Sequence, residues 1–262
     1  MNVTECTNVA NTTVSKNRKI EYIVIHYTAG ITSKPGTAKS NAKYFAKETT
    51  KASADFIIDD ENVVRYNPDI KNRYCWHCGG SKYKTKGGSL YKICTSANSI
   101  GIEMCSTNSA KKVTNPNDSN WYFTDAVVNN CVELTKQLMD EYGIDIDHVV
   151  RHYDVNGKPC PGVVGWNEDT NDILAWLSFK TRLVEKEFKE LVEETAEETK
   201  QAIDAKIDTL VSEIRPDNKD TEEPEVKEIK NSENLTKIPV KTKQKQDIFD
   251  LIVSFLIGLF KK

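Results

Sequence analysis

Short runs of alternating hydrophobic and polar residues fill the first two thirds of the chain, and this alternation predicts strands. The pattern predicts strands at residues 20–28, 52–58, 63–66, 99–105 and 149–152. The second and third of these are joined by Asp59–Asn62, a polar run typical of a hairpin turn. The first run is rich in Ile, Val and Tyr, so we expect it to be buried.

Apolar residues at three- and four-residue spacing predict a long helix between the last two strands. Its apolar positions are Val127, Val128, Cys131, Leu134, Leu138 and Tyr142. Thr124 is suited to cap its first turn, and Gly143 is suited to end it. Shorter helices are predicted at 40–48 and 166–179. The expected fold class is α/β, with a mixed central β-sheet flanked by helices.

Composition divides the 262 residues into two parts. All four Trp and all seven Cys lie before residue 178, so the hydrophobic core belongs to the first part. We therefore expect a folded domain at 18–179, after a polar segment at 1–17. Basic and acidic residues balance in this domain, and the whole chain has a net charge of -3. A nucleic-acid-binding protein would show a clustered positive field, so a nucleic-acid partner is not expected.

Two histidines and one cysteine stand at positions suited to binding a metal ion. His26 lies near the end of the first predicted strand, and the last strand ends with His152, followed by Cys160. Structural zinc sites use close pairs of ligands, whereas His26 is far in sequence from the other two. Two His nitrogens and one Cys sulfur leave the fourth tetrahedral position of Zn²⁺ free. The set therefore predicts a catalytic zinc site, with Zn²⁺ as the cofactor.

Three segments together resemble a known enzyme family. They are the strand with His26, the segment Asn98–Cys105 and the stretch from His152 to Cys160. Through them, roughly residues 18 to 178 resemble the zinc-dependent N-acetylmuramoyl-L-alanine amidases, the type 2 family of phage endolysins, bacterial autolysins and peptidoglycan recognition proteins. The resemblance implies that zinc-activated water cleaves the amide bond between N-acetylmuramic acid and L-alanine. It also implies that bacterial peptidoglycan is the partner.

The resemblance implies catalytic roles for two further residues. In related amidases a Lys two positions before the Cys ligand meets the developing oxyanion, which assigns this role to Lys158. An exposed loop lysine is the alternative. Glu103 resembles the glutamate of the phage-type branch and is the candidate general base. Alternation puts it on the strand face shared with Gly101 and Cys105, and the alternative is a solvated edge carboxylate.

The chain departs from much of the family at residues 54 and 55. Ala54 and Asp55 stand where many members have Tyr and His, and that tyrosine is a proposed catalytic group elsewhere. Its absence gives more weight to Glu103 as the base. Asp55 is a second candidate for this role and a candidate substrate contact.

The motif Cys-Trp-His-Cys at 75–78 has two interpretations. Related amidases have a Trp-His or Trp-Ala pair on the floor of the groove here, which makes Trp76 and His77 candidate substrate contacts. A C-x-x-C pair beside a His is also typical of a structural zinc site or a redox dithiol. The cysteines available for such a structural zinc are Cys75, Cys78, Cys94 and Cys105.

The last third of the chain is charged and poor in large apolar residues, apart from its end. Apolar residues at helical steps predict an amphipathic helix at 180–215 that self-associates through 183–214, with a solvated single helix as the alternative. Residues 216–246 are rich in Glu, Lys and Asn and predict a disordered linker. Residues 247–262 predict an apolar helix with two terminal lysines. Its apolar part, residues 248–260, would be about 20 Å long and too short to span a membrane, so we expect surface contact, with docking on 183–214 or a sister subunit as the alternative.

The start of the chain shows no apolar stretch typical of a secretory signal peptide. We expect synthesis in the cytoplasm, with free or metal-bound cysteines, and action on the cell wall after release in phage lysis. Two other functions stay open, a cytoplasmic amidase that recycles wall fragments and a non-catalytic module that binds muropeptides. Non-catalytic members of the family typically lose the Cys ligand, whereas Cys160 is present here.

Overall fold

The computed structural model describes most of the first 185 residues and a few positions beyond them. The described residues are 3–6, 9–110, 115, 118–170, 172–185, 189, 193, 197, 200, 201 and 203–206. The predictions for 216–246 and 247–262, and most of those for 183–214, lie outside these residues. The fold below is that of the compact unit that extends to Leu183.

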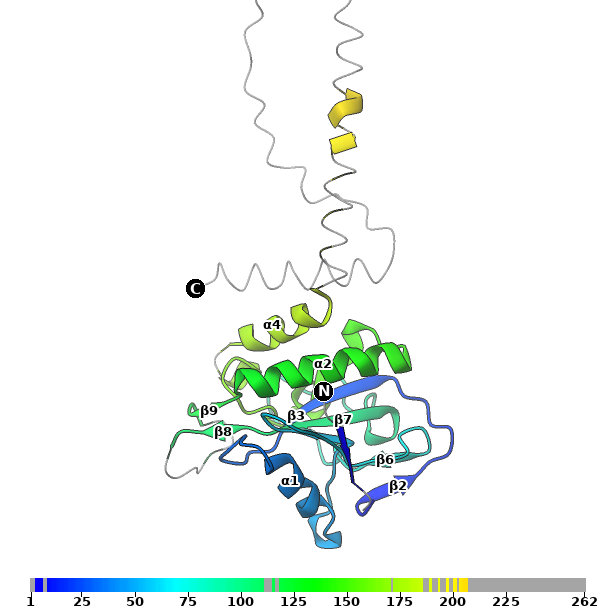
Figure 1. Ribbon diagram of the computed structural model, residues 1–262, viewed down its shortest axis with the longest axis vertical. Coiled ribbons are helices and arrows are strands. Elements are labelled where there is room, and N and C mark those ends of the chain that lie inside the picture. Colours follow the sequence, from blue (N-terminus) through cyan, green and yellow to red (C-terminus); the bar gives the residue numbers. More distant parts are fainter. Residues whose placement is uncertain are drawn as a thin grey trace, which may run out of the picture. The chain divides into compact units, whose positions relative to one another are not determined.

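A six-stranded mixed sheet forms the centre of this unit (Figure 1). Its strands, in spatial order, are β1 (Val3–Glu5), β5 (Val63–Arg65), β4 (Phe56–Ile58), β7 (Ser99–Met104), β3 (Tyr22–Tyr27) and β10 (Val149–Arg151). The strands β4 and β5 form the predicted antiparallel hairpin, and the other neighbouring pairs are parallel. The predicted mixed sheet is thus confirmed, with strands somewhat shorter than expected.

The central strands β3 and β7 carry the most deeply buried apolar residues. Ile23, Ile25, Ile100 and Ile102 are each 0% exposed. Full burial of such a side chain stabilises the fold by about 1.5–3 kcal/mol. These four residues alternate with the positions that carry the candidate chemistry, so one face of each strand supports the fold and the other presents functional groups.

Helices cover the two faces of the sheet, with α2 (Asp125–Tyr142) on one side and α1 (Thr37–Phe45) on the other (Figure 1). The cap residues of α2 are as predicted. The hydroxyl of Thr124 accepts the backbone N–H of Val127, and Gly143 ends the helix in the left-handed conformation, with φ 65°. Local sequence signals therefore mark both ends of this helix.

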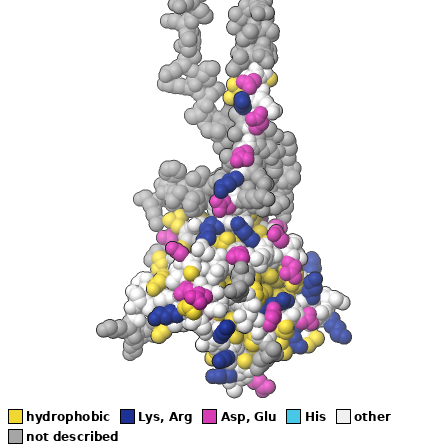
Figure 2. Space-filling view, viewed as in Figure 1, with side chains coloured by type: hydrophobic (Ala, Val, Ile, Leu, Met, Phe, Trp, Pro, Cys, Tyr) yellow, Lys and Arg dark blue, Asp and Glu magenta, His cyan; other side chains and the backbone are white. Residues whose placement is uncertain are grey.

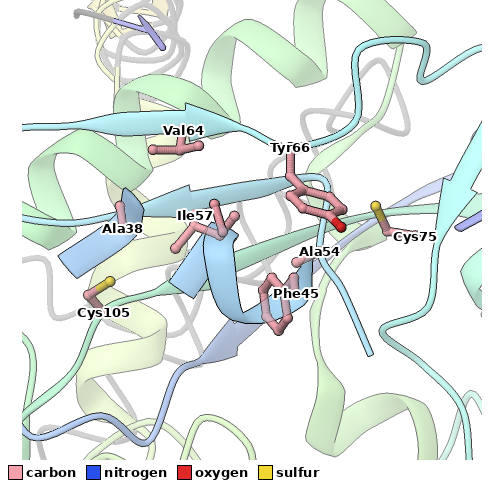
Figure 3. Packing of buried hydrophobic residues seen from close by; sticks show 9 residues of the cluster. Ala38, Phe45, Ala54, Ile57, Val64, Tyr66, Cys75 and Cys105 are labelled. Atoms are coloured by element: carbon pink, nitrogen blue, oxygen red, sulfur yellow. The ribbon is translucent and has the colours of Figure 1, made fainter. Parts of the chain in front are cut away.

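The helix α1 buries small residues against the hairpin strands. Figure 3 shows Ala38 and Phe45 beside Ile57, Val64 and Tyr66, all members of one buried cluster. This helix begins three residues earlier than the predicted 40–48 and ends at residue 45. After α1 the chain forms a short 3-10 turn, η1 (Glu48–Thr50).

The helix predicted at 166–179 is wrong in its bounds. The chain first forms turns and the short η4 (Glu168–Thr170), and α4 covers Leu174–Leu183. The carboxylate of Asp172 accepts the backbone N–H of Leu174 at 3.2 Å, which favours a helix start at this point. The ammonium of Lys180 is buried and donates to the backbone oxygens of Ile146 and Val149. The folded domain therefore extends past the predicted boundary at 179.

The polar segment 1–17 contributes two strands that the sequence did not predict. Besides β1 at the sheet edge, β2 (Thr12–Val14) pairs with β6 (Arg73–Cys75). Val3 and Val14 are 45% and 58% exposed, so backbone hydrogen bonds rather than buried side chains hold these strands. A pattern search for buried residues gives no signal for strands of this kind.

Other short elements complete the described fold. They are η2 (Ser96–Asn98), β8 (Thr107–Asn108), β9 (Trp121–Tyr122), η3 (Ile146–His148) and α3 (His152–Asn156). Within the described residues, no helix has the length and apolar character needed to cross a membrane. On the face of the molecule shown in Figure 2, basic and acidic side chains are interspersed.

Candidate functional site

The candidate chemical groups lie at the C-terminal ends of three neighbouring parallel strands. The register of β7 and β3 pairs Glu103 with His26, both near the ends of their strands. His152 follows directly after β10, which pairs with β3 on its other side. Ligand sites in parallel sheets form at the carboxyl ends of the strands, so the topology alone brings these residues to one place.

The three predicted zinc ligands meet in this place. His26, His152 and Cys160 each offer a ligand atom, and these atoms lie within 4.8 Å of one another. Nδ1 of His26 is 3.7 Å from Sγ of Cys160, and the two histidine rings are 4.7 Å apart between centroids. Tetrahedral Zn²⁺, with Zn–N and Zn–S bonds of about 2.1 and 2.3 Å, separates nitrogen and sulfur by roughly 3.6 Å. The observed spacing fits such an ion.

Several polar atoms at this site are buried and lack a protein partner. Both ring nitrogens of His152, and Oε2 of Glu103, have no hydrogen-bond partner among the described residues. An unpartnered buried polar group costs about 1–3 kcal/mol, and such groups are rare in folded proteins. The donor set and these orphaned atoms together fit a site that binds a cation and a polar substrate group.

Burial shifts the pKa values of the candidate ligands. Desolvation lowers the pKa of His152 to about 3, and the pKa of His26 well below its usual value. Both rings are therefore neutral at pH 7, as metal ligands must be. Burial also raises the pKa of the Cys160 thiol to about 12, with a further increase from Glu103 and a smaller opposing effect of Lys158. Binding of zinc to this sulfur would accordingly release a proton.

The ligands open into a cavity of about 340 Å³. Its lining includes Thr28, Tyr44, Trp76, Tyr83, Glu103 and Lys158. Trp76 is 37% exposed, and its indole N–H donates to the hydroxyl of Thr13 at 2.8 Å, which fixes the ring at the rim. The predicted contact of Trp76 with substrate fits this position and stays a prediction.

Both predicted catalytic residues lie in the cavity wall. Burial raises the pKa of Glu103 to about 8, and the positive charge of Lys158 acts in the opposite direction. Lys158 is exposed, and its backbone N–H donates to the side chain of Asn156 at 3.0 Å. Gly157 precedes it with φ 81°, and a Cβ at this position would lie 2.5 Å from the hydroxyl oxygen of Thr85. This tight turn directs the following residues toward the cavity.

An ion pair that the sequence analysis missed holds His152 in place. The guanidinium of Arg151 is buried and binds the carboxylate of Asp154 through two hydrogen bonds of 2.9 and 2.6 Å. Asp154 also accepts the backbone N–H of Arg151, which closes the first turn of α3 around His152. The spacing of three residues between Arg and Asp is the signal that could have indicated this pair.

The substrate contact and base role considered for Asp55 do not fit its position. Its side chain is 0% exposed and does not line the cavity. Its two oxygens accept hydrogen bonds from the side chain of Asn67 at 2.7 Å and from the backbone N–H of Gly101 at 2.8 Å. Asp55 therefore joins β4 to β7 from within the core.

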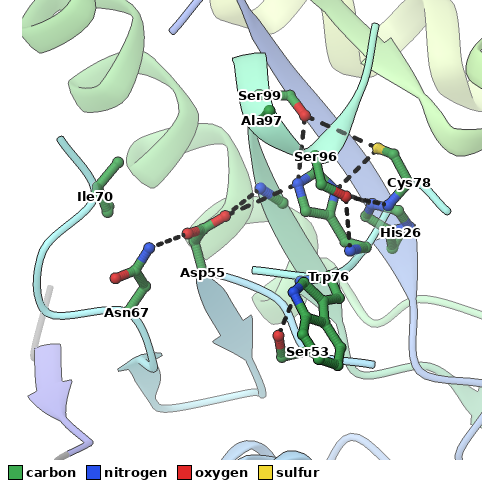
Figure 4. A network of polar contacts seen from close by, with 12 residues as sticks. His26, Ser53, Asp55, Asn67, Ile70, Trp76, Cys78, Ser96, Ala97 and Ser99 are labelled. Carbon is green, nitrogen blue, oxygen red and sulfur yellow. Dashed lines mark hydrogen bonds and ion pairs between the residues drawn. The ribbon is translucent and has the colours of Figure 1, made fainter. Parts of the chain in front are cut away.

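His77 also lies deeper than a substrate contact requires. Only 1% of its side chain is exposed, although the residue borders the cavity. Its Nδ1 is 3.1 Å from Nε2 of His26 and 3.1 Å from Sγ of Cys78. Figure 4 shows Asp55, Ser99, Cys78 and His26 joined in this polar network. The ring thus contacts a candidate ligand and leaves almost no surface for a substrate.

The alternative structural zinc site is not formed by the cysteines. Among the described residues, a second group that could hold a metal consists of His26, His77 and Cys78. Cys75 belongs instead to the apolar cluster under α1. The C-x-x-C motif therefore does not bring its two sulfurs to one metal-binding group.

Comparisons with known proteins agree with this geometry. Residues 16–163 match the family model of N-acetylmuramoyl-L-alanine amidases. The amidase CwlA of Bacillus subtilis (strain 168) is 31% identical over 176 residues, which cover 66% of this chain and 52% of CwlA. The amidase XlyB of the same organism is 33% identical over 141 residues, which cover 54% of this chain and 37% of XlyB.

A solved structure shows the same fold. The catalytic domain of XlyA is 26% identical, with a TM-score of 0.50, and the match covers 70% of this chain and 99% of that domain. By contrast, the chain spans only 52% of CwlA and 37% of XlyB. The likeness therefore covers about half of CwlA, about a third of XlyB and nearly the whole catalytic domain of XlyA.

Proposed function

The chain belongs to the N-acetylmuramoyl-L-alanine amidase family, and from this membership we propose that it hydrolyses the amide bond between N-acetylmuramic acid and L-alanine in bacterial peptidoglycan. The observation that carries the proposal is the meeting of His26, His152 and Cys160 in the lining of one cavity. The orphaned nitrogens of His152 support it, because a bound cation would give one of them a partner that the described residues do not supply.

We further propose that His26, His152 and Cys160 hold Zn²⁺. Zinc supplies two effects to such a site, since it polarises the scissile carbonyl and makes water acidic enough to serve as a nucleophile near neutral pH. The two neutral imidazoles and one thiolate leave one tetrahedral position for this chemistry. Their burial excludes competing water from the ligands.

Glu103 and Lys158 supply the proton transfer and the charge stabilisation. The unpartnered oxygen of Glu103 is free to take the proton of the attacking water and later to pass it to the departing amine. The raised pKa of Glu103, about 8, suits a group that both accepts and returns a proton near neutral pH. The exposed ammonium of Lys158 at the cavity wall can stabilise the negative charge that develops on the carbonyl oxygen.

The test is digestion of purified bacterial cell walls by the full-length protein, followed by mass spectrometry of the products. The expected products are glycan strands with free lactyl groups and stem peptides with a new amino terminus at L-alanine. Treatment with a chelator should abolish their formation, and added Zn²⁺ should restore it.

Other outcomes would contradict the proposal in distinct ways. Cleavage at a different bond would retain a hydrolase and reject the amidase assignment. Full activity after removal of all bound metal would reject zinc. Binding of muropeptides without any cleavage would favour the non-catalytic module. The site of action, on the wall after release, stays a prediction.

A further inference from the structure

The ring of His26 has two nitrogens in different surroundings. Nδ1 lies 3.7 Å from Sγ of Cys160, and Nε2 lies 3.1 Å from Nδ1 of His77. A neutral imidazole carries a hydrogen on one nitrogen and a lone pair on the other, and only the lone pair can bind a metal. The position of one hydrogen on His26 therefore decides whether the ring can serve the cation site on its Cys160 side.

The hydroxyl of Ser99 connects the ring of His77 to a backbone oxygen. The hydroxyl of Ser99 donates to the backbone oxygen of Thr95 at 2.5 Å, so its own oxygen is left as an acceptor. This oxygen lies 3.3 Å from Nε2 of His77. The carboxylate of Asp55 is 4.0 Å from the same nitrogen. Two negative or electron-rich oxygens favour the hydrogen on Nε2 of His77, which leaves Nδ1 as the acceptor.

The acceptor nitrogen of His77 then determines the tautomer of His26. Nδ1 of His77 can receive the N–H of His26 Nε2 over the observed 3.1 Å. With its hydrogen on Nε2, His26 turns the lone pair of Nδ1 toward Cys160. With its hydrogen on Nδ1 instead, His26 would turn the lone pair of Nε2 toward His77. If His77 kept its hydrogen on Nε2, two lone pairs would face each other between the rings. If the hydrogen moved to Nδ1 of His77, its hydrogen bond to Ser99 would be lost.

Packing holds the ring of His77 in the position that this hydrogen bond requires. The imidazole lies against β7 at Gly101, where a Cβ would be 2.6 Å from Cγ of His77. The backbone N–H of Gly101 donates to Asp55, which ties the strand to the same network. A residue with any side chain at 101 would displace the ring.

We propose that His77, anchored by Ser99, is a positioning residue that sets the tautomer of His26 so that Nδ1 of His26 binds the catalytic cation. Metal-bound histidines commonly donate their other N–H to a second group, and removal of that group weakens metal affinity by about 10- to 100-fold. The inference deepens the proposed zinc site and rests on it. It assigns the contacts among His26, His77 and Cys78 to hydrogen bonding and not to a second ion.

The unpartnered atoms support this choice between the two possible metal groups. His152 has no hydrogen-bond partner among the described residues on either nitrogen, so its group needs a ligand. In the other group, His26, His77 and Cys78 have hydrogen-bond partners in one another and in Ser99. A satisfied group needs no ion to offset its burial.

The first test reads the tautomers directly by long-range ¹H–¹⁵N correlation NMR on the full-length protein. The chain has four His, so single substitutions assign every ring. At neutral pH we expect the hydrogen on Nε2 in both His26 and His77. Addition of Zn²⁺ should shift the ¹⁵N resonance of His26 Nδ1 and leave that of His77 Nδ1 nearly unchanged. A hydrogen on Nδ1 of His26, or a zinc-induced shift of His77 Nδ1 as large as that of His26 Nδ1, would overturn the proposal.

The second test measures zinc affinity by competition with a chelator, without any substrate. His77→Leu removes the acceptor and should weaken binding by about 10- to 100-fold. His77→Asn places an amide oxygen near the position of Nδ1 and should restore most of the affinity. A protein that merely needs a filled cavity at 77 would show the reverse order, because Leu fills the apolar space better than Asn.

A matched pair of glycine variants completes this test. Gly101→Ala should displace His77 and weaken zinc binding like His77→Leu, whereas Gly79→Ala has open space around the added methyl and should bind zinc normally. Equal affinities for Gly101→Ala and Gly79→Ala, with both folded by circular dichroism, would contradict the positioning role. Because zinc affinity is read without substrate, these results are separate from the cell-wall digestion. A protein that binds zinc with the expected tautomers but cuts no wall would reject only the amidase proposal.

Discussion

The two sides of the His26 ring differ in how far the protein satisfies its own polar atoms. On the His77 side, each ring nitrogen and hydroxyl has a hydrogen-bond partner. On the His152 side, two nitrogens and a carboxylate oxygen are buried without one, among the residues that the structure describes. Such atoms are rare in folded proteins because each one costs free energy, and a bound ligand would offset that cost. This difference distinguishes the hydrogen-bonded network around His77 from the proposed cation site around His152.

The largest expected effect comes from substituting the cysteine on each side of the His26 ring, Cys160 on one and Cys78 on the other. Cys160→Ser should reduce zinc affinity by more than about a hundredfold and abolish activity, since it removes a direct ligand. Cys78→Ser should retain zinc, because Cys78 belongs to the hydrogen-bonded group around His77 and is not one of the proposed ligands. Metal content by mass spectrometry and activity on cell walls are the measurements. Equal loss of zinc from both variants would mean that the two sides are one metal centre.

Glu103→Gln tests the function of the unpartnered carboxylate oxygen of Glu103. The amide keeps the size of the side chain but cannot accept the proton of water, so kcat should fall by about 10²- to 10⁴-fold. Zinc content should be unchanged, because Glu103 is not among the candidate ligands. The wild-type rate should rise with pH through the pKa of Glu103, which burial raises to about 8 without the cation. A variant that retains full kcat would exclude Glu103 as the base.

Lys158→Met tests the charge at the cavity wall. The substitution removes the ammonium and keeps a long flexible side chain, so kcat should fall by about 10²- to 10³-fold with little change in KM. Lys92→Met, outside the cavity lining, is the matched control. A rise in KM with unchanged kcat would show that Lys158 binds the ground state of the substrate instead of the oxyanion.

The smallest expected effect is on the stability of the metal-free protein as pH changes. Burial lowers the pKa of His77 to about 4 and that of His152 to about 3, and it lowers the pKa of His26 strongly. Below pH 6.5 the histidines of the unfolded chain therefore bind protons that those of the folded protein do not bind. The free energy of unfolding decreases as the pH falls. Each such difference of one proton contributes about 1.4 kcal/mol per pH unit.

Glu103 acts in the opposite direction over part of this range. Its raised pKa means that the folded protein holds a proton between about pH 4.5 and 8 that the unfolded chain has lost, so its contribution rises as pH falls. Because three histidines outweigh one glutamate, the free energy of unfolding should decrease as the pH falls from 6 to 5. Urea unfolding at pH 7, 6 and 5 measures it, and His152→Asn should flatten the slope. A stability that increases from pH 6 to 5 would contradict the neutral, buried state of the rings.

Much of the fold could be predicted because its signals are local. The cap at Thr124 and the hairpin at Asp59 depend on side chains that bond to backbone within a few residues. The stop at Gly143 depends on the freedom of glycine to adopt a positive φ. The strands β1 and β2 could not be predicted, since their side chains are exposed or only partly buried and their hydrogen bonds come from distant segments. The start of α4 at Leu174 was missed because Trp166 packs against Trp176 and Phe179 instead of continuing a helix.

The candidate site divides in the same way. Residue type, motif spacing and the family resemblance pointed to His26, His152, Cys160, Lys158 and Glu103, which line one cavity in the structure, and their roles stay predictions. The same reasoning made Asp55 and His77 candidate substrate contacts, although both side chains are buried and only His77 borders the cavity. A sequence motif indicates which residues occur together in a family, and it says nothing about how deeply each side chain is buried.

The sequence by itself determined the chemistry of this protein, namely the donor types, their order along the chain and the strands that carry them. Tertiary structure decided which of these groups are exposed to a ligand and which support another residue. The physical reason is that hydrogen-bond satisfaction and desolvation depend on neighbours brought together from distant positions. His26 shows both, because its sequence position marks it as a ligand while the packing of His77 against Gly101 and the anchor at Ser99 select the nitrogen that we propose binds.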